Sequence, residues 1–267
     1  MRKPKGAPGA HHGSSRKGRR ESTRQLQREE TLYGIQAVWE ALNHRQRRLD
    51  RLLIKASSGN RRLQEVRGLA QAQGVPVQEM DVRDLDRACT GSVHQGVVLL
   101  CGPRMLGDSS ELPDPQSSPF PVLVALDQVE DPHNLGAILR TCGFLGASAL
   151  VVPRDHTPPL GGAVAKSSTG VSEWFPILSA PNLHRFLKQA QQLGYWVVGL
   201  DQEEARPLKE LQRDRPLILV LGNEGQGLRQ LTRQTCDWTV GISGSGAVDS
   251  LNVSNAAAIA LYQVLSF

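Results

Sequence analysis

Three short segments in the second half of the chain carry polar side chains directly after apolar runs of strand length. They are Asp127 to Thr141 (DQVEDPHNLGAILRT), Leu221 to Gly227 (LGNEGQG) and Ser250 to Ala258 (SLNVSNAAA). Ligands of open α/β sheets bind where strands turn into helices. Asparagine, serine and glutamate can orient a substrate through hydrogen bonds, and arginine offers a rigid fork of donors suited to phosphate. The order of the three segments therefore predicts one shared active site.

The first segment predicts an amphipathic helix with Asn134 at its N-cap position. At 100° per residue, Arg140 lies about 140° around the helix from Leu135, and Gly136 and Gly143 flank the same direction. An arginine between two glycines leaves room for another backbone or a ligand to approach closely, although a surface arginine beside incidental glycines is also possible. The apolar stripe of this helix is Leu135, Ile138, Leu139, Cys142 and Leu145.

The second and third segments favour backbone turns. Three glycines in six residues after Leu221 let the chain turn sharply and expose amide groups to a ligand. Glu224 is either a carboxylate at a helix start or a residue that orients a ligand. Ser250 or Asn252 is expected to cap an alanine-rich helix. The chain contains neither a dinucleotide fingerprint nor a G-x-x-x-x-G-K-[ST] loop.

Hydrophobic periodicity predicts alternating strands and helices. Residues 1–30 are expected to form a disordered basic tail, 31–102 a small α/β domain, 103–120 a linker rich in proline, and 121–267 an α/β domain with a parallel sheet covered on both faces. Strands are expected at 51–55, 75–80, 96–100, 122–126, 148–152, 195–200, 217–221 and 238–242, and helices at 33–42, 61–73, 81–89, 135–145, 183–193 and 252–265.

The basic charge of the chain is confined to its beginning. Of the net charge of +5, residues 1–30 contribute +6, and residues 1–20 hold seven basic residues and no acid. Such a stretch is typical of a phosphate-binding arm or a solvated or targeting segment. A mitochondrial transit peptide is also basic and poor in acids, but it should have an apolar face, which this stretch lacks. No apolar run is long enough for a transmembrane helix, so no membrane partner is expected.

The four cysteines are Cys89, Cys101, Cys142 and Cys236, and they show neither a C-x-x-C pair nor a histidine at metal-ligand spacing. Because they sit in apolar surroundings, we expect buried, reduced thiols in a reducing compartment and no structural metal.

Taken together, the patterns N-x-G-x-x-x-R-T from Asn134, L-G-N-E-G-x-G from Leu221 and S-L-N-V-S-N-A-A-A from Ser250 resemble the three motifs of the SpoU family of the SPOUT superfamily. These proteins are S-adenosyl-L-methionine-dependent RNA 2′-O-ribose methyltransferases. Residues 31–102, from Leu32-Tyr-Gly34 to His94-Gln-Gly96-Val97, resemble the family's substrate-binding domain, whose fold is related to kink-turn-binding ribosomal proteins.

The resemblance implies a deep trefoil knot, a rare exception to ordinary chain connections. It also implies that Gly222, Ile242 and Leu251 contact S-adenosyl-L-methionine, and that Asn134, Arg140, Glu224, Ser250 and Asn252 form the polar active-site set. The family's proposed catalytic residue corresponds to Arg140. Because arginine stays protonated in proteins, we expect Arg140 to bind a phosphate or a developing alkoxide, while Ser250 and Asn252 orient the ribose. The segment Lys166-Ser-Ser-Thr-Gly170 resembles a further motif that has no assigned role.

Together with the basic leader, the resemblance implies 2′-O-methylation of a guanosine ribose in mitochondrial large-subunit rRNA by a homodimer located in the matrix. The small domain would present an unpaired loop of the rRNA to the site. Two alternatives stay open: a tRNA ribose 2′-O-methyltransferase, and a ribosome-assembly factor that keeps the fold without catalysis. The complete set of five polar residues argues against the second.

Overall fold

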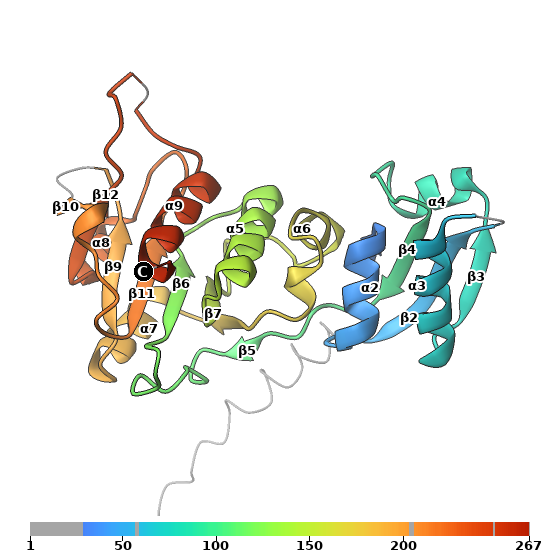
Figure 1. Ribbon diagram of the computed structural model, residues 1–267, viewed down its shortest axis with the longest axis horizontal. Helices are drawn as coiled ribbons and strands as arrows, with labels where there is room; N and C mark the ends of the chain where they lie inside the picture. The colour runs from blue at the N-terminus through green and yellow to red at the C-terminus, as the bar shows by residue number, and fades with distance from the viewer. Residues whose placement is uncertain (1–28, 57–58, 203–205, 248, 267) are drawn as a thin grey trace, which may run out of the picture.

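The computed structural model describes residues 29–56, 59–202, 206–247 and 249–266, which form two α/β units lying end to end (Figure 1). The predicted basic tail falls outside the described residues except for Glu29 and Glu30. Glu30 begins the first strand of the smaller unit, so the tail is shorter than predicted at this end.

The smaller unit contains a four-stranded mixed sheet of order β1-β4-β2-β3. Its strands are antiparallel except for the parallel pair β2 and β3. The elements are β1 (Glu30–Tyr33), α2 (Ile35–His44), β2 (Leu49–Lys55), α3 (Arg61–Ala72), β3 (Val77–Met80), α4 (Val82–Ala88) and β4 (Val97–Cys101). The three helices and strands β2 to β4 confirm the predicted alternation, whereas β1 was not predicted.

The larger unit contains an eight-stranded sheet of order β10-β12-β9-β11-β6-β7-β8-β5, in which every pair of neighbours is parallel. The predicted α/β class with a parallel sheet is confirmed, and the knot stays a prediction. Its strands are β5 (Gly107–Asp108), β6 (Val122–Leu126), β7 (Ala149–Pro153), β8 (Ile177–Ala180), β9 (Trp196–Leu200), β10 (Arg206–Pro207), β11 (Leu217–Leu221) and β12 (Trp238–Gly241). Its helices are α5 (Pro132–Leu145), α6 (Gly162–Ser167), η1 (Val171–Glu173), α7 (Leu183–Gln192), η2 (Leu208–Glu210), α8 (Gln230–Thr235) and α9 (Val253–Leu265).

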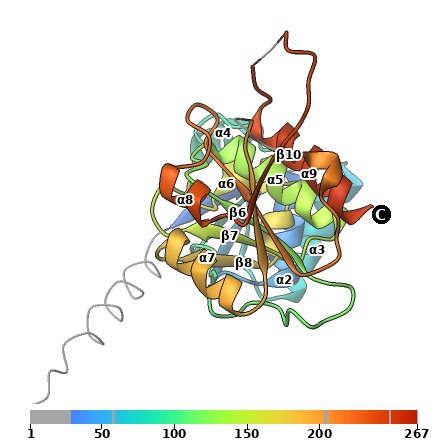
Figure 2. The ribbon, with the colours of Figure 1, turned by 90° about the vertical axis from the view of Figure 1, so that its left-hand side faces the viewer.

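The continuous apolar strands are buried on both faces of the larger sheet. In β6, Val122, Val124 and Leu126 pack into one core with α5 and α9, while Leu123 and Ala125 pack into another core with α7. Figure 2 shows α7 and α8 on one side of the sheet and α5 and α9 on the other. A strand that alternates between two cores has no polar face, which explains the uninterrupted Val/Leu pattern.

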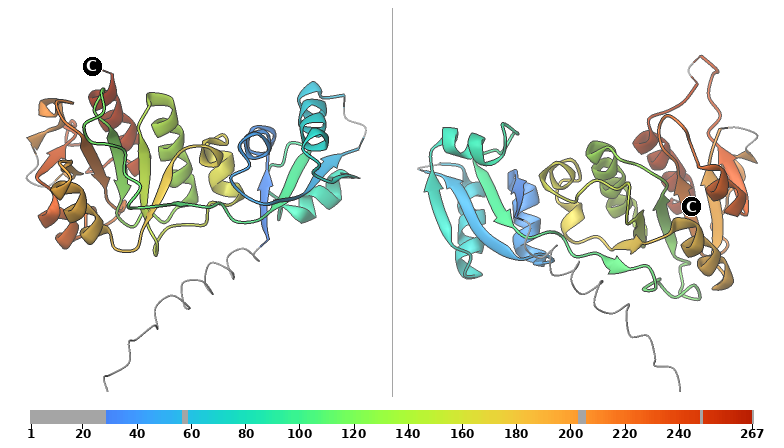
Figure 3. Two further views of the ribbon diagram at one scale, coloured as in Figure 1. Left: turned by 90° about the horizontal axis from the view of Figure 1, so that it is seen from below. Right: turned by 180° about the vertical axis from the view of Figure 1, so that it is seen from behind.

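Several short elements were not predicted because they carry too few residues to reveal a period. Helices α6 and α8 span six residues each, and β8 spans four. The predicted linker is not wholly irregular, since β5 within it pairs with β8 at the edge of the larger sheet. The chain between the two units runs along the outside of the larger unit and carries this strand (Figure 3).

The predicted N-cap of α5 is wrong. Asp131 occupies the cap, and its Oδ1 accepts a hydrogen bond from the backbone N–H of His133 at 3.0 Å. Pro132 takes the first helical position, where its missing N–H is not needed. Asn134 is consequently inside the first turn, where its side chain is free to face another segment.

Cys89, Cys101 and Cys142 are buried, as predicted, and Cys236 is half-buried; all four are free thiols. Burial raises the pKa of Cys101, Cys142 and Cys236 to about 12, so these thiols stay protonated and unreactive in the folded protein. Within the part of the chain that the structure describes, the helices are too short or too polar to cross a bilayer.

Candidate active site

Strands β6 and β11 are adjacent, parallel and in register, with Leu126 opposite Leu221. Their carboxyl ends therefore meet at one edge of the sheet, and the backbone N–H of Asp127 donates to the carbonyl of Leu221 at 2.7 Å. The first two polar segments begin at this edge, where α/β sheets bind ligands. The third segment joins them through α9, which packs against α5.

Three side chains, one from each segment, form what we name the amide–carboxylate cluster: Asn134, Glu224 and Asn252. Glu224 Oε1 accepts hydrogen bonds from Asn134 Nδ2 at 2.7 Å and from Asn252 Nδ2 at 2.6 Å. Asn252 Nδ2 also lies 3.0 Å from Asn134 Oδ1. Hydrogen bonds from amide groups to a charged carboxylate oxygen are shorter and stronger than hydrogen bonds between neutral groups. The cluster therefore fixes the positions of all three side chains.

Asn252 contributes to the cluster because it is the N-cap of α9. Its Oδ1 accepts from the backbone N–H of Ser254 at 2.9 Å, which leaves its Nδ2 to face Glu224. Of the two predicted caps, Asn252 is the one observed. Glu224 is not at a helix start but in the glycine loop after β11. Its Oε2 makes no hydrogen bond with any residue that the structure describes, and Glu224 itself is exposed and lines the cavity.

The glycine loop folds back tightly on itself. The backbones of Asn223 and Gly227 exchange hydrogen bonds of 3.0 and 2.9 Å, and a Cβ on Gly222 would lie 2.2 Å from the carbonyl carbon of Gly227. Behind the loop, the fully buried Asp127 accepts from the backbone N–H and Nε of Arg229 at 3.0 and 2.6 Å. Only glycine fits at position 222, and Asp127 holds the end of the loop in place.

A cavity of about 420 Å³ opens between this loop and the start of α9. This volume lies within the range of about 300–1,000 Å³ that is usual for small-molecule sites. Its wall includes all three predicted cofactor contacts, Gly222, Ile242 and Leu251. Glu224 and Ser250 from the predicted polar set also line it. Asn134 and Asn252 lie beside the cavity through their bonds to Glu224.

Arg140 is the one predicted site residue that stands apart. It is exposed on α5 and has no hydrogen bond or ion pair with a described residue. Helix geometry places it about 9 Å along the axis and about 120° around it from Asn134. The space beside its two flanking glycines is filled by the protein itself. A Cβ on Gly136 would meet Ser167 Oγ at 1.8 Å, and one on Gly143 would meet Val171 at 2.8 Å.

Polar cavity residues outside the three segments were missed by the reasoning from sequence: Asp201, Gln202, Arg233 and Asp249. Asp201 follows β9 directly, so the rule that polar residues after strands form sites would have identified it. It is 9 % exposed, and its Oδ2 pairs with Arg233 Nη2 at 2.6 Å. No group of three or more His, Cys, Asp and Glu side chains within the described ranges could hold a metal ion.

Two family models match the chain. The model described as the SpoU rRNA Methylase family matches residues 121–262, and one described as RNA 2′-O ribose methyltransferase substrate binding matches residues 31–105.

Individual proteins agree with these matches. The chain is 39 % identical over 238 residues to the 23S rRNA (guanosine-2′-O-)-methyltransferase RlmB of Pseudomonas aeruginosa, covering 88 % of this chain and 96 % of the relative. It is 36 % identical over 238 residues to RlmB of Haemophilus influenzae, covering 88 % and 97 %. The AdoMet-bound rRNA methyltransferase of Sinorhizobium meliloti has the same fold, with a TM-score of 0.75 over 92 % of this chain and 89 % of the other at 24 % identity.

Substituting Gly222→Ala is expected to destabilise the glycine loop by about 1–3 kcal/mol, because the new methyl group overlaps the backbone of Gly227. Gly225→Ala in the same loop is the matched control, since a Cβ there has its nearest neighbour at 3.6 Å. Urea unfolding of both variants measures the difference. Equal free energies of unfolding would contradict the described packing of the loop.

Proposed function

The chain belongs to the SpoU rRNA methylase family, and we propose that it transfers a methyl group from S-adenosyl-L-methionine to the 2′-hydroxyl of a guanosine ribose in large-subunit rRNA. The observation that carries this proposal is the meeting of the three polar segments at one cavity, with the amide–carboxylate cluster at its edge. The match of residues 31–105 to a substrate-binding domain supports an RNA substrate.

The cavity suits S-adenosyl-L-methionine in size and lining. Its wall combines the folded-back glycine loop with the apolar side chains of Ile242 and Leu251. Backbone groups of the loop can bind polar edges of a nucleoside, and the apolar side chains can cover its flat faces. The bound cofactor supplies a methyl group on a sulfonium, which is already a good leaving group. The protein then has to position and activate the ribose hydroxyl.

We assign that positioning to the amide–carboxylate cluster and Ser250. Two amides hold Glu224 Oε1, so its Oε2 is fixed in direction and free to receive a proton from the 2′-hydroxyl. Ser250 lines the cavity next to the cluster, where its hydroxyl can bond a ribose oxygen. We assign to Arg140, supplied by a second copy of the chain as proposed below, the binding of the phosphate next to the reacting ribose.

Glu224→Gln tests this assignment because glutamine keeps an oxygen for both amide donors and loses the proton acceptor. We expect kcat on large-subunit rRNA to fall about 100- to 10,000-fold, while calorimetric titration gives an unchanged affinity for S-adenosyl-L-methionine. A Glu224→Gln enzyme with wild-type kcat would exclude Glu224 as the acceptor.

The wild-type chain itself tests the alternative functions. Cofactor binding without methylation of any RNA would identify a non-catalytic factor, and methylation of tRNA alone would identify a tRNA enzyme.

We further propose that two copies form a homodimer through the face of α5 and α9. These helices pack side by side, and both carry exposed apolar side chains: Phe144 is 87 % exposed, Tyr262 58 % and Ile259 43 %. Phe144 follows Arg140 by one helical turn, so both point to the same side of α5. A second copy on this face would cover the apolar side chains and bring its Arg140 toward the amide–carboxylate cluster of the first.

Phe144→Glu is expected to convert the dimer into a monomer with lower activity, because a buried unpaired carboxylate opposes association. Leu193→Glu, at an exposed leucine after α7 on the opposite face of the sheet, is the control. Light scattering after gel filtration measures the mass.

Mixing Arg140→Ala with Glu224→Gln protomers is then expected to restore activity, since one site of the mixed dimer has both residues. A monomeric wild-type chain, or a mixture without recovery, would contradict this arrangement.

A mitochondrial matrix location is a separate proposal. It is supported by the seven basic residues and absence of acids in residues 1–20 and by the buried free thiols, which suit a reducing compartment. Imaging of the full chain fused at its C-terminus to a fluorescent protein, with and without residues 1–30, tests it. Mitochondrial signal that is lost on deletion is expected, and an unchanged diffuse signal would contradict the proposal.

A further inference from the structure

Helix α6 and the short helix η1 lie between the two units of the protein, with α5 on one side and α2 on the other (Figure 1). We refer to residues 162–173 as the joint segment. It includes Lys166-Ser-Ser-Thr-Gly170, the motif to which the resemblance gives no role. Both neighbours of this segment matter for the proposed reaction, since one carries Asn134 and the other belongs to the substrate-binding domain.

On the catalytic side, the joint segment contacts the helix turn that holds Asn134. Ser167 Oγ lies 3.3 Å from the carbonyl of Pro132, and it occupies the space where a side chain at position 136 would stand. Pro132 and Gly136 lie two residues before and after Asn134. A displacement of α6 would therefore displace the amide–carboxylate cluster.

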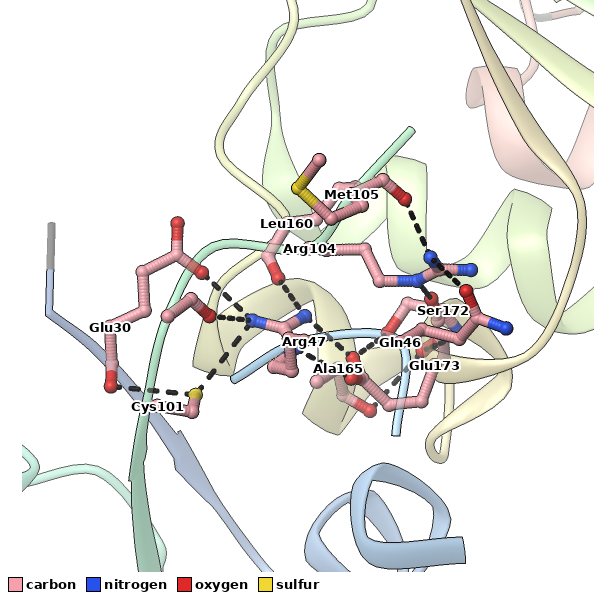
Figure 4. A network of polar contacts seen from close by, with 12 residues as sticks. Glu30, Gln46, Arg47, Cys101, Arg104, Met105, Leu160, Ala165, Ser172 and Glu173 are labelled. Atoms are coloured by element: carbon pink, nitrogen blue, oxygen red, sulfur yellow. Dashed lines mark hydrogen bonds and ion pairs between the residues drawn. The ribbon is translucent and has the colours of Figure 1, made fainter. Parts of the chain in front are cut away.

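On the other side, the joint segment holds the substrate-binding domain through a buried ion pair. Arg47 Nε and Nη2 donate to the two carboxylate oxygens of Glu173 at 2.8 and 2.9 Å, and the side chains are 0 % and 1 % exposed (Figure 4). The remaining donors of Arg47 reach the carbonyl of Leu160 at 2.9 Å and Glu30 Oε2 at 2.9 Å. A second arginine, Arg104, donates to the carbonyl of Ser172 at 3.1 Å.

Other close contacts join the joint segment to the substrate-binding domain. A Cβ on Gly162 would lie 2.6 Å from the carbonyl of Thr31, and one on Gly170 would lie 2.5 Å from Cγ of Glu40. Lys166 Nζ donates to Gln95 Oε1 at 2.7 Å. The two domains are therefore in close contact at Gly162, Gly170 and Lys166.

Stability alone does not explain a buried ion pair at this place. The cost of removing two charges from water offsets most of their attraction, and apolar residues of similar volume often stabilise as well or better. A bidentate arginine–carboxylate pair does supply direction, because its parallel hydrogen bonds form in one relative orientation.

We propose that Arg47 and Glu173 are positioning residues that fix the orientation of the substrate-binding domain relative to the amide–carboxylate cluster. The RNA held by that domain then presents one ribose at the cluster. This inference rests on the proposed methyl transfer, and it assigns the joint segment the role of setting which ribose is reached.

Arg47→Met tests the proposal, with Arg48→Met as the matched control. Arg48 is the neighbouring residue, but it is half exposed and pairs with Asp50 inside its own domain. We expect Arg47→Met to lower kcat/KM on an rRNA fragment about 100-fold, the effect of a misplacement of about an ångström, with unchanged affinity for S-adenosyl-L-methionine and with 2′-O-methylation spread to neighbouring nucleotides. The control is expected to behave as wild type.

The double variant Arg47→Met/Glu173→Leu separates orientation from stability. Arg47→Met leaves the buried carboxylate of Glu173 without its arginine partner and is expected to lower the melting temperature, whereas the double variant removes both charges of this pair. We therefore expect the double variant to have a melting temperature closer to wild type while its kcat/KM stays low. Wild-type kcat/KM in either variant, or parallel loss of cofactor binding and methylation in both, would overturn the positioning role. A wild-type chain that transfers no methyl group would instead contradict the proposed function, so the two failures are distinguishable.

Discussion

The carboxylate oxygen Glu224 Oε1 ties together three segments that are far apart in sequence, because it accepts hydrogen bonds from both Asn134 and Asn252. Each partner is placed by an independent local rule. Asn134 lies in the first turn of α5, which Asp131 caps, Asn252 caps α9, and Glu224 follows the buried strand β11. The hydrogen bonds form only if the helix turn, the helix cap and the strand end each place their residue correctly. The position of the cavity and the proposed direction of the free Oε2 follow from this one contact.

The parallel sheet and most of its helices could be predicted from periodicity, because strands such as β6 and β11 are buried on both faces and therefore uniformly apolar. Short elements could not be predicted, since a six-residue helix such as α6 completes too few turns to show a pattern. The cap of α5 was misassigned because Asn134 and Asp131 are both suitable cap residues. The decisive feature was Pro132, which favours the first helical position.

The composition of the site could also be predicted, but not its geometry. Residues after strands gather at one edge of any parallel sheet, which is why the three polar segments could be assigned to one site in advance. The choice of Gly222, Ile242 and Leu251 as cofactor contacts came from the resemblance to the SpoU family, and the structure places all three at the cavity wall. The separation of Arg140 from the cluster depends on the rotation of α5 between Asn134 and Arg140. The glycines beside Arg140 could equally have accommodated a ligand, and only the structure shows that α6 and η1 fill that space. The ion pair between Arg47 and Glu173 spans 126 positions and has no local signature.

The central claim is that the amide–carboxylate cluster positions one ribose of large-subunit rRNA for 2′-O-methylation, with Glu224 accepting the proton of its hydroxyl. Mapping of 2′-O-methyl positions in rRNA and tRNA from cells whose only copy of this protein carries Glu224→Gln tests it most directly. The expected result is loss of a single 2′-O-methylguanosine in large-subunit rRNA, at a normal level of the protein and with all tRNA positions unchanged. Persistence of every rRNA methylation, or loss confined to tRNA, would contradict the claim.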